Sequence, residues 1–459
     1  MSLLKQAIVI AIAFCLLSLL ILVGVGVPSD SSKEPKNEPP FYISIIEAGT
    51  EDSKIYSYKF DQQENDPNLI LLETNYVKVK PGLFAIADTP SETDAGVISL
   101  IAHVDAFVPS EKRTFSPLLL RAPSSLQDEL ENPDFEGESK ENQDPSEKNQ
   151  KGWTGGPTPL LLRAARGALL RSGYAVPGLE SAMIIDTQHR ALYSWYAANY
   201  VIDNFKFENA SEATIEFEWD SLKVTYELYE NNLELLDPKD VYEIAFQGKT
   251  KKIFSKSYKN LGLLDLRLAL LELENDSNNT SWKSSCINPD VEDEPFLFKE
   301  NTFKVSGSLP GKINENGKNS VDILKCQYFI NQINLEDLNE GPDQKNILPH
   351  LLPGFLEQSK VVINVPNYKR ESDSEEDFNT ISGKKYLKHA REICSAGNNG
   401  PFACSDLLLL RKLLISAFGF DDDEQTLVVK SVQDKEINWA LGFAHSQLAK
   451  HIALSTVAN

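Results

Sequence analysis

An uncharged apolar run near the N-terminus constrains the chain more than any other feature of its sequence. It extends from Ala7 to Val27 and contains no charged residue. About 21 residues in a helix rise roughly 31 Å, which matches the hydrocarbon thickness of a bilayer. We therefore expect a single membrane-spanning helix at residues 7–27. Lys5 precedes the run, which favours a cytosolic tail at residues 1–6.

A cleaved signal peptide is the alternative for the same segment. Lys5 supplies the basic start that such peptides need, and the small residues Gly24 and Gly26 provide a cleavage site before Val27. The apolar run is longer than the core of an ordinary signal peptide, which favours the anchor. Both alternatives place the bulk of the chain outside the cytosol.

The cysteines agree with an exported chain. Four of the five lie outside the apolar run, and an oxidising compartment favours disulfides between them. We prefer the pairings Cys394 with Cys404 and Cys286 with Cys326. The first pair closes a short loop rich in Gly, Asn and Pro, which are turn-forming residues.

A metal site is the alternative for the first of these pairs. His389 precedes Cys394 and Cys404, and all three side chains are zinc-ligand types. Their spacing matches no familiar zinc motif. The disulfide is therefore the preferred interpretation.

The charge of the chain limits its partners. The formal net charge is -22, with 67 acidic against 45 basic residues. Nucleic-acid binding needs a basic surface that displaces counterions from phosphates, so we expect no nucleic-acid partner. The expected partners are membrane lipid, through the N-terminal helix, and another protein of the cell envelope.

Changes in composition divide the chain. Residues 28–40 are rich in Pro, Ser and charge, as a linker is, and residues 124–151 are acidic with few aliphatic side chains, as a disordered segment is. The predicted parts are a tail (1–6), a transmembrane helix or signal peptide (7–27), a linker (28–40), a β-rich domain (41–122), an acidic disordered insertion or linker (123–156), an α+β domain with hairpins (157–285) and a mixed domain ending in an amphipathic helix (286–459).

Alternating apolar residues predict strands in much of the chain. The clearest are at residues 215–228, where Ile215 and Phe217 alternate with Glu216 and Glu218, and the phase then shifts by one position, as at a hairpin turn. A second hairpin is predicted around residues 241–258. Residues 96–108 and 263–274 are also interpreted as strands, and residues 323–330 as a further candidate strand.

Helical periodicity is clearest towards the C-terminus. Helices are predicted at residues 384–394 and 405–419, and a final helix from residue 434 places an apolar stripe on one face. The fold class expected from these elements is α+β. We expect the membrane helix to be followed by a strand-rich extracytoplasmic region of two or three domains.

Each of two residue clusters can be interpreted as structural or as a binding site. Arg163, Arg166 and Arg171 could bind an anion or a membrane, but pairing with local carboxylates is favoured. The aromatic residues between 193 and 207 could form a sugar-binding platform, but aromatic residues at this spacing usually fill a core.

No motif of a known catalytic site is present, and the six histidines are scattered. Asp421, Asp422 and Asp423 are candidate calcium ligands without the spacing of a calcium-binding loop, so no cofactor is the preferred expectation. The preferred function is a membrane-anchored extracytoplasmic protein that acts by binding or assembly. The alternative is an anchored hydrolase that acts on a polymer through carboxylates, with or without calcium.

Overall fold

The computed structural model describes residues 38–457 with gaps. The gaps are 63–67, 88, 124–156, 202–210, 229–235, 247–248, 277–279, 300, 309–311, 314–316, 318, 336–360, 365–378, 382, 397–399, 419–421, 423–425, 429–430 and 433–434. Residues 40–459 form one compact unit, and residues 1–39 form a second unit that lies almost entirely outside the described residues.

The predicted membrane segment, from Ala7 to Val27, falls outside the described residues. Among the helices that the structure describes, none combines the length and apolar character needed to cross a bilayer.

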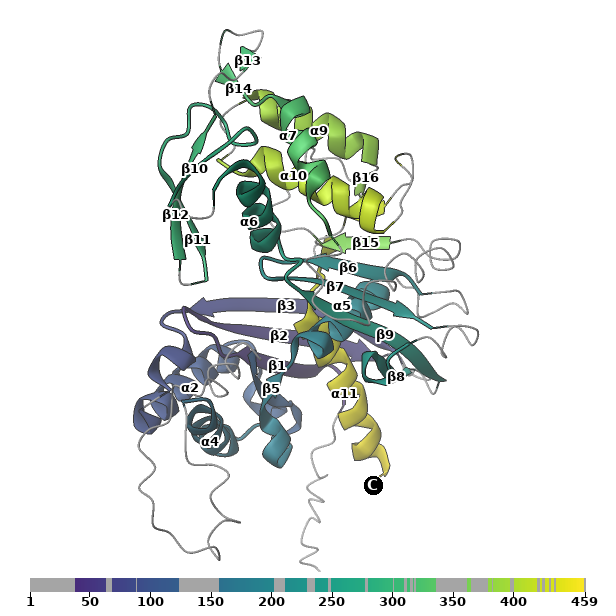
Figure 1. Cartoon of the computed structure of the whole chain (residues 1–459). Coiled ribbons are helices and arrows are strands. Elements are labelled where there is room, and N and C mark those ends of the chain that lie inside the picture. The colour runs from purple at the N-terminus through teal and green to yellow at the C-terminus, as the bar shows by residue number, and fades with distance from the viewer. Residues whose placement is uncertain are drawn as a thin grey trace, which may run out of the picture. The chain divides into compact units, whose positions relative to one another are not determined.

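A five-stranded sheet forms the N-terminal half of the compact unit (Figure 1). Its strand order is β3-β2-β1-β4-β5, with β1 antiparallel to β2 but parallel to β4. The elements are β1 (Phe41–Glu47), β2 (Ser53–Gln62), β3 (Leu69–Val79), η1 (Leu83–Ile86), α2 (Pro90–Asp105), η2 (Ser110–Phe115), β4 (Leu118–Pro123), α4 (Pro157–Leu170), η5 (Gly178–Ser181) and β5 (Ala182–Ile185).

A seven-stranded sheet forms the second half, in the order β16-β17-β15-β6-β7-β9-β8. Its elements are β6 (Ala213–Phe217), β7 (Ser221–Glu227), η7 (Pro238–Asp240), β8 (Val241–Phe246), β9 (Lys249–Lys259), α6 (Leu263–Glu274), α7 (Ile323–Gln332), β15 (Val361–Asn364), β16 (Asn379–Ile381), α9 (Gly383–Ala396), α10 (Ala403–Lys412), the π-helical turn η8 (Leu413–Ala417) and β17 (Thr426–Val428).

The two sheets share one topology. In the first, β1, β2 and β3 are antiparallel neighbours, and β4 and β5 add in parallel on the other side of β1. In the second, β6, β7 and β9 are antiparallel neighbours, and β15 and β17 add in parallel on the other side of β6. The compact unit is therefore built from two copies of one βββαβαβ pattern, and β1 corresponds to β6.

Smaller elements complete the described chain. They are β10 (Ser281–Ser284), β11 (Glu294–Phe298) and β12 (Asn301–Gly307) in one sheet, β13 (Lys312–Ile313) with β14 (Asn319–Ser320), and β18 (Ser431–Val432) with β19 (Lys435–Glu436). The β10–β12 sheet packs on α6 through Leu271 and Trp282, which belong to one apolar cluster.

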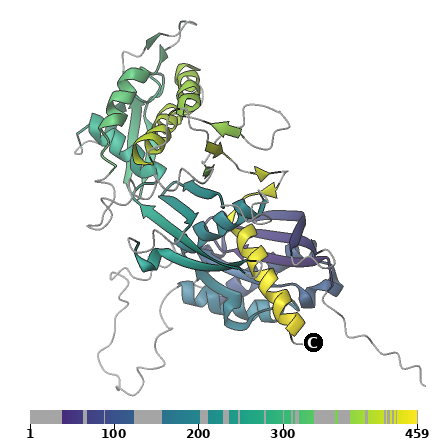
Figure 2. The same ribbon diagram turned by 90° about the vertical axis from the view of Figure 1, so that its right-hand side faces the viewer.

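Helix α5 (Thr187–Val201) packs against elements of both halves, and α11 (Trp439–Val457) packs along it. Residues Ala197 and Ala198 of α5 join the core under β1, whereas Leu192 and Trp195 pack against Ile253 of β9. Figure 2 shows α11, in yellow, crossing in front of the N-terminal sheet, where Leu441 and Ala444 enter the same core as β1.

The other face of each sheet is covered by its own helices. Helices α2 and α4 cover the N-terminal sheet, with Val97, Leu100 and Leu161 packed on Ile46. Helices α6, α7, α9 and α10 contribute to the largest apolar cluster, which lies on the β6–β7–β9 face that carries Ile215 and Phe217.

The predicted α+β class is wrong, since parallel strands joined through helices are the frame of both halves. The error began with three helices interpreted as strands: α2, α6 and α7 cover most of residues 96–108, 263–274 and 323–330. In α6, the buried positions Leu263, Leu266 and Leu270 follow the three- and four-residue spacing of one helix face. Leucine also occupies every second position from 264 to 270, and this alternation is typical of a strand.

Candidate functional site

An ion pair with a buried carboxylate lies at the turn end of the first hairpin. Glu47 ends β1 and is directly opposite Lys54 of β2. Its Oε2 lies 3.5 Å from Lys54 Nζ and accepts a 3.2 Å hydrogen bond from the Tyr56 hydroxyl. Glu47 is only 6% exposed, so its charge needs these partners.

The second hairpin repeats this arrangement. Glu216 of β6 is directly opposite Lys223 of β7, and six residues separate the two positions, as they separate Glu47 from Lys54. Glu218, in the turn, lies 2.7 Å from Lys223 Nζ through its Oε2. Lys223 is 2% exposed and Glu216 is 8% exposed. The corresponding hairpins thus place a glutamate and a lysine at the same position.

A glycine from a later segment packs closely against the backbone of each turn. A Cβ on Gly82 would lie 2.0 Å from the Gly49 carbonyl oxygen, and a Cβ on Gly262 would lie 2.4 Å from the Ser221 nitrogen. The segment after Gly82 donates from Phe84 N to Gly49 O, and the segment after Gly262 donates from Leu263 N to Glu218 O. Each turn therefore packs against a backbone segment that can approach this closely only because the residue there is glycine.

Arg190 of α5 connects the two hairpins. Its Nη2 lies 3.2 Å from Glu47 Oε1, and its charge also acts on Glu216 and Glu218. The guanidinium carbon is 5.3 Å from the centre of the Trp439 ring of α11. We call the following six residues the hairpin cluster: Glu47, Lys54, Arg190, Glu216, Glu218 and Lys223.

The two glutamates of the second hairpin differ in acidity. Burial raises the pKa of Glu216 to about 7, although Lys223 acts in the opposite direction. Burial also opposes ionisation of Glu218, but the charges of Lys223 and Arg190 outweigh it and lower the pKa of that carboxyl. Glu216 Oε2 has no hydrogen-bond partner among the described residues. Glu216 is therefore the group of the cluster that can gain or lose a proton near neutral pH.

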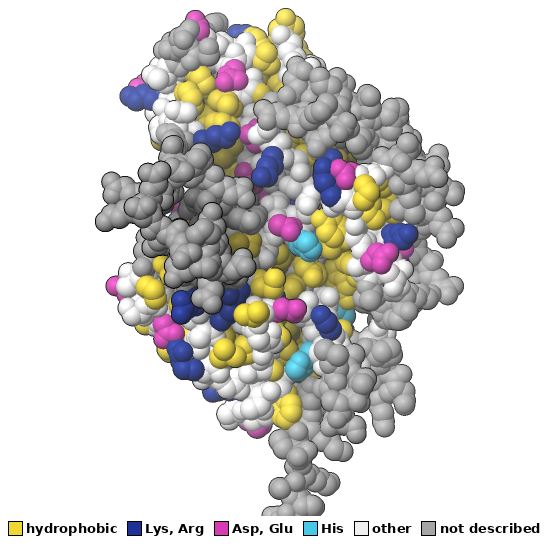
Figure 3. Space-filling view, turned by 60° about the horizontal axis from the view of Figure 1, so that its bottom comes forward, with side chains coloured by type: hydrophobic (Ala, Val, Ile, Leu, Met, Phe, Trp, Pro, Cys, Tyr) yellow, Lys and Arg dark blue, Asp and Glu magenta, His cyan; other side chains and the backbone are white. Residues whose placement is uncertain are grey.

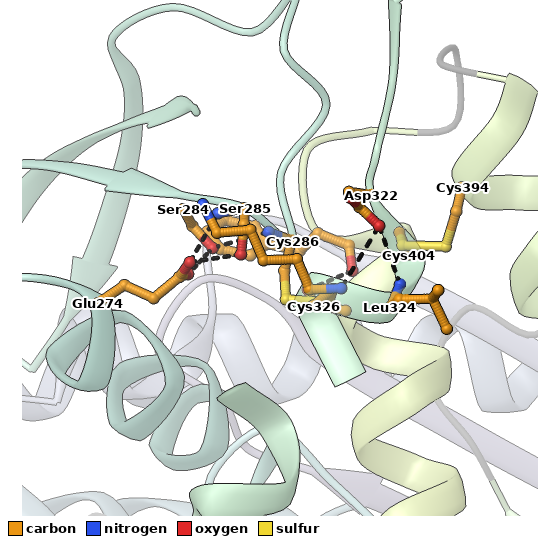
Figure 4. The surroundings of a disulfide bond; sticks show 12 residues. Glu274, Ser284, Ser285, Cys286, Asp322, Leu324, Cys326, Cys394 and Cys404 are labelled. Carbon is orange, nitrogen blue, oxygen red and sulfur yellow. Dashed lines mark hydrogen bonds between the residues drawn. A yellow bond between two sulfur atoms is a disulfide. The ribbon is translucent and has the colours of Figure 1, made fainter. Parts of the chain in front are cut away.

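The structure contains both disulfide pairings preferred from the sequence (Figure 4). Cys286 and Cys326 join the β10–β11 region to α7, and Cys394 and Cys404 join α9 to α10. Glu274 accepts hydrogen bonds from Ser284 and Ser285 beside the first bridge. Asp322 accepts from the Leu324 and Lys325 nitrogens at the start of α7. These contacts fix the loop before Cys286 and the start of the helix that carries Cys326.

The metal candidates of the sequence gain no support from their surroundings. Both oxygens of Asp422 accept from Arg411, at 2.6 and 2.7 Å, and Asp421 and Asp423 lie outside the described residues. Cys394 and Cys404 are bonded to each other rather than free to join His389. Within the described ranges, no three His, Cys, Asp or Glu side chains gather as they would around a metal ion.

Two of the three arginines and the described aromatic residues make structural contacts, whereas Arg163 is exposed and Phe205 and Phe207 lie outside the described residues. Arg166 donates to the Leu179 and Ala182 carbonyls, and Arg171 pairs with Asp94. Trp195 and Tyr196 are buried between α5 and β9. On the face shown in Figure 3, acidic and basic side chains are interspersed rather than segregated.

The sequence interpretation missed the hairpin cluster although it identified the second hairpin. Alternation identifies Glu216, Glu218 and Lys223 only as the polar positions of strands, which usually face water. In the structure, α5 covers that face, and Ser194 of α5 makes a hydrogen bond to Glu216. The repeated spacing of Glu47 to Lys54 and Glu216 to Lys223 was the available signal.

Comparisons with known proteins define the class. The model of the GDA1/CD39 (nucleoside phosphatase) family matches residues 33–127 and 169–458, which is well over half of the chain. The chain therefore belongs to this family, and its mixed α/β fold is of the actin-like type. The gap in the match contains most of the acidic segment predicted at residues 123–156.

Two curated relatives illustrate the similarity. "Ectonucleoside triphosphate diphosphohydrolase 6" of Mus musculus is 22% identical over 88% of this chain and 80% of its own length. "Ectonucleoside triphosphate diphosphohydrolase 5" of Ailuropoda melanoleuca is 24% identical over 87% of this chain and 86% of its own length. Among solved structures, nucleoside triphosphate hydrolases from Neospora caninum align over 91% of this chain and 85% of theirs, with 11% identity and a TM-score of 0.43. This last likeness is too distant to bear on function.

The family corrects the predicted function. A protein that acts by binding or assembly is the wrong class, because the chain belongs to a family of phosphatases. The alternative, an anchored hydrolase that acts on a polymer, does not match the family either, because the family is one of nucleoside phosphatases. None of the short motifs considered in the sequence indicates this family, whose model matches residues 33–127 and 169–458.

Proposed function

We propose that this chain hydrolyses nucleoside di- or triphosphates and that the hairpin cluster is its phosphate site. One observation carries the proposal: in a chain of the nucleoside phosphatase family, two corresponding hairpins bring buried charges together around Arg190. The names of the curated relatives support phosphoanhydrides of nucleosides as the substrate class.

The cations of the cluster account for phosphate binding. The side chains of Arg190 and Lys54 are 25% and 34% exposed, so both can reach a ligand, whereas Lys223 is buried against Glu218. An arginine pairs its planar donors with two phosphate oxygens, and its charge stabilises the oxygens that become more negative in the transition state. Arg190 is positioned for this because Glu47 and Trp439 hold its guanidinium.

Glu216 accounts for activation of water. In the proposed reaction, a water oxygen attacks the terminal phosphorus, its proton passes to Glu216, and the bond to the bridging oxygen breaks to release inorganic phosphate. A general base works best when its pKa is near the working pH, and burial brings the pKa of Glu216 to about 7. The carboxylate must be deprotonated to accept the proton.

The Glu216→Gln substitution tests this role. Since general bases usually contribute about 100- to 10,000-fold, we expect phosphate release to fall at least about 100-fold. In the unchanged chain, the rate is expected to rise with pH and to level off above about 7, as the base form of Glu216 is populated. The measurement is release of inorganic phosphate from nucleoside tri-, di- and monophosphates by the full-length chain between pH 5 and 9.

Glu227→Gln is the matched control. Glu227 lies on the same strand as Lys223, but pairs with Lys251 at 2.7 Å, outside the cluster. Its replacement should leave the rate and the pH profile unchanged. A Glu216→Gln chain as active as this control would remove Glu216 from the mechanism, and an inactive unchanged chain would refute the proposed function.

We further propose that the reaction takes place outside the cytosol, with the chain held to membrane lipid by residues 7–27. The relatives' names begin with "ecto", and the apolar run and the cysteines support export. An envelope protein partner remains a proposal from the sequence alone. N-terminal sequencing of the mature chain tests the anchor, because a first residue at Val27 would show a cleaved signal peptide.

A further inference from the structure

The carboxylates of the hairpin cluster determine whether it can hold a divalent cation. Enzymes that transfer phosphoryl groups commonly use Mg²⁺ or a similar ion to bridge phosphate oxygens. Such ions need several oxygen ligands at about 2.0–2.6 Å, so a resident site requires carboxylate oxygens that are not already paired.

Glu47 has no unpaired oxygen to offer. Its Oε1 pairs with Arg190 Nη2 at 3.2 Å, and its Oε2 pairs with Lys54 Nζ at 3.5 Å and with the Tyr56 hydroxyl at 3.2 Å. A metal ion at this carboxylate would have to displace two cations from a buried anion.

In the second hairpin the lysine pairs with the glutamate of the turn. Glu218 Oε2 lies 2.7 Å from Lys223 Nζ, and Lys223 also acts on Glu216 directly across the strands. Glu216 Oε2 has no hydrogen-bond partner among the described residues, but no three His, Cys, Asp or Glu side chains of the described ranges gather as a hard cation would require. The residues present therefore do not fit a divalent metal.

We propose that this chain binds the phosphates of a nucleotide without a divalent cation, using the positive charges of Arg190 and Lys54 instead. The inference rests on the proposed function, since it concerns the same site. Its basis is the repeat itself: each hairpin sets a lysine opposite a glutamate, so the neutralising charge is part of the fold.

The charge balance supports this assignment. The cluster holds three basic and three acidic side chains, and when Glu216 is protonated the balance becomes positive. A phosphate group then meets a net attraction, whereas a divalent cation meets the repulsion of Arg190, Lys54 and Lys223. Phosphate binding is thus favoured at or below neutral pH.

Calorimetric titration of the full-length chain with a non-hydrolysable nucleoside triphosphate analogue tests the proposal. It is performed at pH 6.5 in EDTA, and again with millimolar Mg²⁺ or Ca²⁺. We expect dissociation constants that agree within about threefold, as no ligand contact would depend on the ion. An affinity at least tenfold higher with the ion would overturn the inference while leaving the proposed function intact. Absence of binding in every buffer would refute both.

The Lys223→Met variant provides a second, sharper readout. Removal of Lys223 leaves Glu216 and Glu218 without the lysine nearest to them, so these carboxylates become more available to a metal although Arg190 still acts on both. We expect nucleotide binding by this variant to become dependent on Mg²⁺ or Ca²⁺, by at least tenfold. Lys251→Met is the control, since Lys251 pairs with Glu227 outside the cluster, and it should bind as the unchanged chain does. Equal ion dependence in the two variants would contradict the proposal.

Discussion

Replacement of Arg190 by methionine is expected to abolish phosphate release and nucleotide binding and to destabilise the fold. Methionine keeps much of the length and apolar stem of arginine but has no charge. The change removes the phosphate-binding group and also the cation that pairs with Glu47 Oε1 and acts on Glu216 and Glu218. Loss of one partner from a buried pair costs about 3–5 kcal/mol, and Lys54 would offset part of that cost at Glu47.

The measurements are phosphate release, nucleotide titration and urea unfolding. Arg171→Met is the matched control, because Arg171 also pairs with a carboxylate, that of Asp94, but its side chain is 59% exposed. Exposed pairs contribute about 0–1 kcal/mol, so this control should retain stability and activity. The Arg190→Lys variant separates charge from shape: it should recover stability more fully than activity, since lysine lacks the paired donors of arginine. If Arg190→Met hydrolysed nucleotides as well as Arg171→Met does, the hairpin cluster would not be the phosphate site.

Removal of the Cys286–Cys326 disulfide is expected to have the second largest effect. The bridge spans 40 residues, and a closed loop of that length lowers the entropy of the unfolded chain by an amount worth about 4 kcal/mol at 25 °C. Both cysteines are fully buried in the largest apolar cluster, which ties the β10–β11 region to α7. The Cys286→Ala/Cys326→Ala chain should therefore unfold at a much lower urea concentration.

The second bridge supplies the comparison. Cys394 and Cys404 close a loop of only 10 residues, for which the same relation gives about 2.7 kcal/mol. Urea unfolding of both double alanine variants under non-reducing conditions should rank the first below the second. The opposite ranking would mean that the bridges act chiefly through native contacts rather than through the unfolded chain.

The sequence predicts best those elements whose pattern is set by neighbouring residues. The hairpin at residues 215–228, the second hairpin at 241–258 and the last helix all follow from periodicity, and β6, β7, β8, β9 and α11 occupy those regions. Local periodicity gives the wrong prediction for α6, because leucine at successive even positions is typical of a strand. Only the tertiary contacts of Leu266 and Leu270 with the second sheet decide in favour of the helix.

The candidate site could not be predicted from local sequence patterns, because its residues are far apart in the chain. Glu47 and Glu216 are 169 positions apart, and their relation depends on the correspondence of β1 with β6 in two sheets. Arg190 joins them from a helix between the hairpins in sequence, so no short motif contains all three residues. Burial of Lys223 depends on α5 covering a strand face that, in isolation, would face water.

The central claim is that nucleotide phosphates bind at the hairpin cluster. The most direct measurement is a crystal structure of the full-length chain with a non-hydrolysable nucleoside triphosphate analogue, grown in the presence of Mg²⁺. We predict phosphates between the turns at residues 48–53 and 218–221, with Arg190 in hydrogen-bond contact and the ion pairs of Glu47 and Glu218 intact. Phosphates bound elsewhere, or Glu47 and Glu218 turned from their lysines to hold a metal ion, would contradict the account.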